Sequence, residues 1–90
     1  MNDVVEIFLR VRRPDIAYIK FIIESYEGVG IVRTIDRYAA IIVILVAPDF
    51  EELARDLVAA MAAQVPCVEI SRPPEAGNDW LLRPDPDEGE

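Results

Sequence analysis

The first part of the chain alternates between apolar and polar residues and then changes period. From residue 4 to residue 11 every second residue is apolar: Val5, Ile7, Leu9 and Val11. This period of two predicts a β-strand with Phe8 on its opposite side. Pro14 ends the strand. From Asp15 to Tyr26 apolar residues recur every three or four positions, which predicts a helix that Gly28 and Gly30 terminate.

The rest of the pattern predicts three more strands and a second helix. Strands are expected over 31–36, 38–47 and 67–72, with a tight turn at Arg37 between the first two. The run 38–47 is apolar on both sides, as in a strand at the centre of a sheet. The second helix opens at 48–52, where Asp49 and Glu52 have the spacing of a capping box. Its expected inward residues are Phe50, Leu53, Leu57, Ala60, Met61 and Gln64.

The order β-α-β-β-α-β predicts an α+β, ferredoxin-like sandwich for residues 1–72, with a four-stranded antiparallel sheet and two helices on one face. Right-handed crossovers would place the first and third strands at the centre. The uncovered sheet face would carry four apolar residues, Phe8, Ile41, Val43 and Leu45, among Glu6, Arg10, Arg33 and Glu69. So many apolar residues on one face predict an interface, because water rarely meets such a patch.

Residues 73–90 differ in composition and predict an extended, acidic tail. They hold four prolines, two glycines and six acids. Trp80-Leu81-Leu82 interrupts this tail, either as an incidental apolar spot or as an anchor on the domain or on a partner. We therefore expect an interface built from the four outer-face residues and from Trp80, Leu81 and Leu82. A homodimer packed sheet to sheet, pairing of edge strands, or the tail itself could cover the face.

Charge and hydropathy exclude several partners. The net charge is −8, of which the six acids and one arginine of residues 73–90 contribute −5, so nucleic acid is not an expected partner. The longest apolar run, 39–47, has nine residues, whereas a membrane span needs about 20. Met-Asn-Asp at the start is acidic where a signal peptide is basic, and a single cysteine fits a reducing compartment. We expect a cytoplasmic protein.

The side-chain inventory argues against catalysis. The chain has no histidine, which removes Ser-His-Asp and Cys-His nucleophile systems and most zinc and nickel sites. Cys67 has neither a base nor a second thiol beside it in the pattern, so we interpret it as structural. Glu51 and Glu52 are adjacent on a helix and point about 100° apart, so they cannot pair across a substrate. We expect no enzyme activity, no metal and no cofactor.

Two stretches carry a family resemblance. Val11-Arg12-Arg13-Pro14-Asp15-Ile16, followed by a helix and then by Gly30-Ile31-Val32-Arg33-Thr34-Ile35, resembles the ACT-type regulatory modules, whose first strand also ends in Arg-Pro. The resemblance covers about residues 4–72. The chain also resembles a bacterial family of small stand-alone domains whose function is unassigned.

The ACT resemblance implies a small effector, such as an amino acid, bound at the interface of a homodimer. The residues that it assigns to the ligand are Arg12, Arg13, Pro14, Asp15 and Ile16, with Arg33 from a neighbouring chain. ACT modules usually have glycine where this chain has Asp15, which would repel a carboxylate but attract an ammonium group. In the alternative interpretation, Asp15 binds no ligand and only stabilises the first helical turn. The alternative function is a protein-interaction module that uses the sheet face and the tail and binds no small molecule.

Overall fold

The computed structural model describes residues 4–26 and 28–73. Strand β1 (Val5–Val11) leads into a 3-10 turn, η1 (Arg13–Asp15), and helix α1 (Ile16–Glu24). Strands β2 (Gly30–Asp36) and β3 (Ile41–Val46) follow, then a second 3-10 turn, η2 (Pro48–Phe50). Helix α2 (Glu51–Ala62) and strand β4 (Cys67–Ile70) complete the described chain. This order confirms the predicted ferredoxin-like arrangement.

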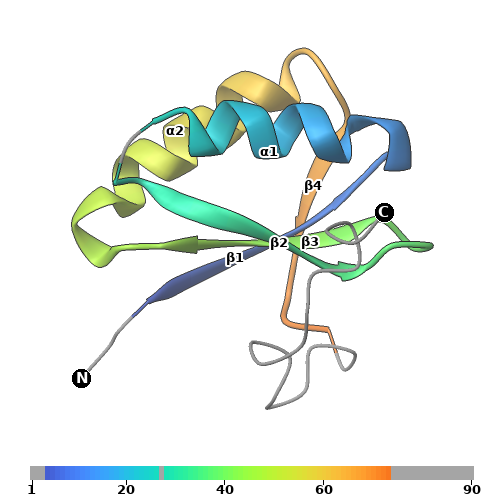
Figure 1. Ribbon diagram of the computed structural model, residues 1–90, viewed down its shortest axis with the longest axis horizontal. Helices are drawn as coiled ribbons and strands as arrows, with labels where there is room; N and C mark the ends of the chain where they lie inside the picture. Colours follow the sequence, from blue (N-terminus) through green and yellow to red (C-terminus); the bar gives the residue numbers. More distant parts are fainter. Residues whose placement is uncertain (1–3, 27, 74–90) are drawn as a thin grey trace.

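The four strands form one antiparallel sheet in the order β2-β3-β1-β4. The apolar strand β3 and the first strand β1 are central, as predicted, and both helices cover the same face (Figure 1). Among the residues that the structure describes, no helix is both long and apolar enough to cross a membrane.

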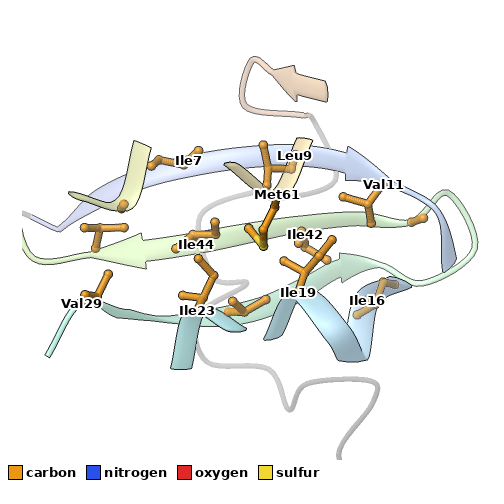
Figure 2. Close-up of a cluster of buried hydrophobic side chains, with 14 residues drawn as sticks. Ile7, Leu9, Val11, Ile16, Ile19, Ile23, Val29, Ile42, Ile44 and Met61 are labelled. Carbon is orange, nitrogen blue, oxygen red and sulfur yellow. The ribbon is translucent and has the colours of Figure 1, made fainter. Parts of the chain in front are cut away.

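The main core lies between the sheet and the helices. Figure 2 shows Ile7 and Leu9 of β1, and Ile42 and Ile44 of β3, pointing towards Ile19 and Ile23 of α1 and Met61 of α2. These side chains are almost fully buried. The alternation in β1 and β3 therefore sorts one set of residues towards the helices, as the period of two requires.

The opposite side of the sheet, called the outer face below, carries a second apolar cluster. Its buried members are Phe8, Ile35, Ile41 and Val43, and Leu45 and Ile70 pack against them. The prediction of Phe8, Ile41, Val43 and Leu45 on this face is confirmed. Glu69 was wrongly placed there, because it lies on the helix side, where its carboxylate accepts hydrogen bonds from Arg55 of α2 at 3.1 and 3.2 Å.

Both helices begin with a 3-10 turn, and this corrects two predictions. Pro14 and Pro48 each lie at one of the first two positions of such a turn. A backbone N–H at these positions has no acceptor within the helix, so proline loses no hydrogen bond there. The expected capping box at Asp49 and Glu52 does not form, because Phe50 is the N-cap of α2 and no side chain caps the helix. Helix α1 ends at Glu24, before Tyr26.

The inward side of α2 is rotated from the predicted one. Its fully buried residues are Ala54 and Met61, with Leu57 and Val58 partly buried. Leu53 is 40 % exposed, and Ala60 and Gln64 are also exposed. A small residue faces the sheet where the helix comes close, so the larger neighbouring leucine points outward.

Two glycines shape the return from α1 to β2. Gly28 has φ +85°, a conformation that side chains strongly disfavour. Gly30 begins β2 opposite Val46, and a Cβ there would overlap the backbone carbonyl oxygen of Leu45. The predicted glycine stop is therefore confirmed, and Gly30 has the further role of letting two strands approach closely.

Candidate functional site

The candidate site begins where β1 ends, at the turn formed by residues 12–16. Arg12 is still extended, with φ −93° and ψ 139°, and the N–H of Asp15 donates to the carbonyl oxygen of Arg12 at 2.9 Å. Pro14 suits this turn because its ring fixes φ near the helical value. The side chain of Ile16 is buried in the main core and anchors the turn from below. The backbone geometry therefore presents Arg12, Arg13 and Asp15 together.

One carboxylate oxygen of this turn lacks a hydrogen bond. Asp15 Oδ2 lies 3.3 Å from Arg12 Nε, which is ion-pair distance. The contact lacks hydrogen-bond geometry, and within the described part of the chain Oδ2 is buried without a hydrogen-bond partner. A buried acceptor without a partner costs about 1–3 kcal/mol. The charge of the Arg12 guanidinium offsets part of this cost.

The second arginine of the turn stacks on the loop between β2 and β3. The guanidinium of Arg13 lies over the ring of Tyr38, 5.8 Å from its centroid, and Tyr38 is 84 % exposed. Asp36 Oδ1 accepts hydrogen bonds from the backbone N–H groups of Tyr38 and Ala39, both at 3.0 Å, which orders this loop. An exposed cation–π contact contributes about 0.5–1 kcal/mol. The contact therefore favours this position of the Arg13 side chain but is weak enough for the side chain to leave it.

A backbone hydrogen bond joins this loop to the site. The N–H of Val11 donates to the carbonyl oxygen of Ala40 at 2.9 Å, and Ala40 has φ +59°. This places Tyr38 in a turn, so the predicted strand 38–47 in fact begins at Ile41. Tyr38 is a residue of the site that the sequence did not reveal, because its aromatic ring fits the pattern of a strand.

Cys67 is the other residue that the fold brings to the turn. It pairs with Val11 across the strands, and the pKa of its thiol is raised by burial and, to a smaller extent, by the negative charge of Asp15. A raised pKa leaves less thiolate at neutral pH, so Cys67 is a poor nucleophile. This agrees with its interpretation as a structural residue.

Not all predicted ligand residues meet. Arg12, Arg13, Pro14, Asp15 and Ile16 share one turn, although Ile16 offers no exposed surface. Arg33 lies in the middle of β2, opposite Val43, and β2 is two strands away from β1. Within one chain, Arg33 is therefore not part of the turn. The site combines two guanidinium groups, one carboxylate and a tyrosine ring, a set of groups that suits recognition of charge.

Two other kinds of site are conceivable among the described residues, a metal site and a ligand pocket. No cluster of three His, Cys, Asp or Glu side chains among them is placed to hold a metal ion. A shallow pocket of about 170 Å³ lies between the helices, lined by Tyr18, Ile22, Tyr26, Leu57, Ala60, Met61 and Gln64. Ligand pockets usually enclose about 300–1,000 Å³, so this one is small for a metabolite.

The predicted interface residues divide into two groups. Phe8, Ile41, Val43 and Leu45 lie together on the outer face. Trp80, Leu81 and Leu82, and with them most of the predicted tail, lie outside the described residues.

Comparison with known proteins gives one result. No curated protein and no solved structure matches the chain significantly. The model of one protein family, described as a domain of unknown function (DUF4911), matches residues 9–65. This range runs from the second half of β1 to beyond α2 and includes both the turn of residues 12–16 and the close approach at Gly30. The match covers more than half of the 90 residues, and the chain therefore belongs to the DUF4911 family.

Proposed function

We propose that this domain is a non-enzymatic regulatory module that binds a small amphoteric metabolite, such as an amino acid, at the turn of residues 12–16. The observation that carries the proposal is the buried Asp15 Oδ2, which lacks a hydrogen bond beside Arg12. A ligand ammonium group would donate to this oxygen. A ligand carboxylate would take the guanidinium groups of Arg12 and Arg13, because arginine binds carboxylates with two parallel hydrogen bonds.

The proposal includes a second copy of the chain. Arg33 is too far along the sheet to join the turn of its own chain, so its predicted contribution would come from a neighbour. This is the arrangement that the ACT resemblance implies, and in it the effector links two protomers. A cytoplasmic location fits the same proposal, because the lone Cys67 remains a thiol in a reducing compartment.

The test is a thermal-shift panel of amino acids, nucleotides and common metabolites at millimolar concentration. A ligand at 100 times its Kd adds about 2.7 kcal/mol, which raises the midpoint of a domain of this size by about 10 °C or more. We expect one selective shift that Arg13→Ala abolishes. The matched control is Arg55→Ala, which removes an equally charged side chain from α2, remote from the turn.

A second variant tests the role of each charge. In Asp15→Asn we expect the response to the amino acid to fall while the response to the corresponding hydroxy acid, which has no ammonium group, persists. A flat panel, or a shift that survives in Arg13→Ala, would contradict the proposal.

The alternative is a protein-interaction module without a ligand. One surface favours it, because α1 exposes Phe21 to 69 %, with Tyr18 exposed on the same helix and Tyr26 exposed two residues after its end. Aromatic side chains are enriched at the centres of interfaces. A flat metabolite panel, together with a binding partner whose affinity falls in Phe21→Ser, would favour this alternative.

A further inference from the structure

The outer face is buried although both helices lie on the other side of the sheet. Val43 is 0 % exposed and Phe8 is 4 % exposed, yet no helix of the described chain covers them (Figure 1). A sheet face left to water would expose the side chains at its centre. An apolar sheet face of this kind is rarely left to water, so it is a candidate surface for a further segment or a partner.

The end of the described chain points to the occupant. After β4, the guanidinium of Arg72 lies 2.7 Å from Glu6 Oε1 and 5.8 Å from the centre of the Phe8 ring. Glu6 and Phe8 belong to the outer side of β1, and Pro73 is buried. The chain therefore leaves β4 across the outer face, with residues 74–90 still to come.

We propose that residues 74–90 pack against the outer face of their own chain, with Trp80-Leu81-Leu82 on the cluster around Val43. Trp80 is seven positions after Pro73, and an extended chain spans about 23–25 Å over seven residue steps. The sheet is about 14 Å wide, because its four strands lie about 4.8 Å apart. Trp80 therefore reaches any part of the cluster.

Charge supports the same occupant. Residues 74–90 carry six acids and one arginine. Arg10 and Arg33 lie on the outer face around the apolar cluster, where Arg10 is opposite Ile41 and Arg33 is opposite Val43. An apolar triplet flanked by acids thus matches an apolar cluster flanked by arginines. Glu6 also lies on this face, but it is paired with Arg72, so two copies of the face would oppose mainly the positive charges of Arg10 and Arg33.

Trp80 is the single tryptophan of the chain, so its fluorescence reports directly on this packing. We expect blue-shifted emission from the full chain and slow quenching by neutral acrylamide, both unchanged on dilution to where sedimentation shows a monomer. Emission like that of free tryptophan amide would overturn the proposal. Shielding that disappears when a dimer dissociates would also overturn it, and would assign the face to a second copy.

A pair of matched variants locates the contact. Ile41→Glu places a carboxylate opposite Arg10, which helps the sheet to tolerate it, while it repels the acidic segment. Phe21→Glu makes the same kind of change on exposed α1. We expect acrylamide quenching of Trp80 to rise several-fold in Ile41→Glu and to stay unchanged in Phe21→Glu, with far-ultraviolet circular dichroism confirming that both fold.

Equal quenching of Trp80 in Ile41→Glu and the unchanged chain would place the segment elsewhere and overturn the proposal. If Ile41→Glu does not fold, Leu45→Ser replaces it, because it removes apolar contact at a partly exposed position of the same cluster and adds no charge that would attract the acidic segment.

Discussion

The carboxylate of Glu24 on α1 accepts a hydrogen bond from the backbone N–H of Val32 on β2 at 3.0 Å. Strand β2 lies at an edge of the sheet, so a backbone N–H on its outer side has no neighbouring strand to donate to. The N–H of Val32 donates to Glu24 instead. A helix side chain therefore closes one position of an edge to which another strand could pair. Lys20 lies 3.9 Å from the same carboxylate oxygen and helps to hold it.

Replacing Glu24 should both destabilise the fold and open this edge. We expect Glu24→Ala to lower the free energy of unfolding by about 1 kcal/mol, since a partly buried N–H loses its acceptor. It should also increase concentration-dependent association through β2. Urea unfolding and sedimentation measure the two effects. Asp56→Ala, which removes an exposed carboxylate from α2, is the control. Equal behaviour of the two variants would show that the bond has no structural role.

The two glycines before β2 should respond differently to the same replacements. Gly30→Ala forces a Cβ against the carbonyl oxygen of Leu45 and should cost about 3 kcal/mol, the upper end of overpacking costs. Gly28→Ala meets only the Phe50 ring at 3.8 Å and should cost about 1 kcal/mol for its positive φ. Asparagine tolerates positive φ, so Gly28→Asn should recover part of that loss and Gly30→Asn should not. Chemical denaturation measures the free energy of unfolding of the four variants, and equal losses at the two positions would contradict this prediction.

The thiol of Cys67 should titrate at higher pH than an ordinary cysteine, because burial and then the charge of Asp15 raise its pKa. Asp15→Asn should lower this pKa, although burial keeps it above the ordinary value. The pH profile of alkylation by iodoacetamide measures it at a single site, since the chain has one cysteine. Asp49→Asn is the control. An unchanged profile in Asp15→Asn would contradict the electrostatic effect of Asp15 on the thiol.

The same shift has a consequence for stability. The folded chain holds the thiol proton more tightly than the unfolded chain does. The contribution of Cys67 to the free energy of unfolding is therefore complete below the unfolded-state pKa and is lost as the pH rises through the raised folded-state pKa. In Cys67→Ser this alkaline loss should be absent.

Neighbouring residues of α2 should differ sharply in their effect on stability. Arg55 Nε lies 3.1 Å from Glu51, and Arg55 Nη1 lies 3.1 Å from Glu69, but all three side chains are largely exposed. Arg55→Met should therefore cost less than about 1 kcal/mol, and the cost should shrink in high salt. Ala54 is fully buried, so Ala54→Leu should cost about 1–3 kcal/mol at any salt concentration. A larger loss for Arg55→Met would refute this order.

The sequence predicted the sheet better than it predicted the helices. In β1, a strict period of two assigns each residue to a face, and the outcome for Leu9 and Phe8 follows directly. In α2, the inward side depends on how the helix sits on the sheet. Ala54 is buried and Leu53 is not, a result that hydrophobicity alone cannot predict, because a small residue allows the closest approach.

The candidate site was predictable only as far as it is local. Arg12 and Asp15 are three residues apart, so a turn at Pro14 is enough to bring them together. Tyr38 and Cys67 reach the same place through strand pairing and through a turn in which Ala40 adopts a positive φ. Such a φ has no signature in an alanine, so the end of β2–β3 pairing could not be placed from the pattern.

The order of the strands has a consequence for the growing chain during synthesis. Strand β1 is made first but lies between β3 and β4, so it lacks one neighbour until Val46 has been added and the other until Ile70 has been added. Until then, Leu9 and Phe8 lack the packing partners that the neighbouring strands provide on the two faces of the sheet. A chain from which α2 but not yet β4 has emerged from the ribosome would therefore be a nearly complete domain with an open sheet edge at β1, a natural target for chaperones.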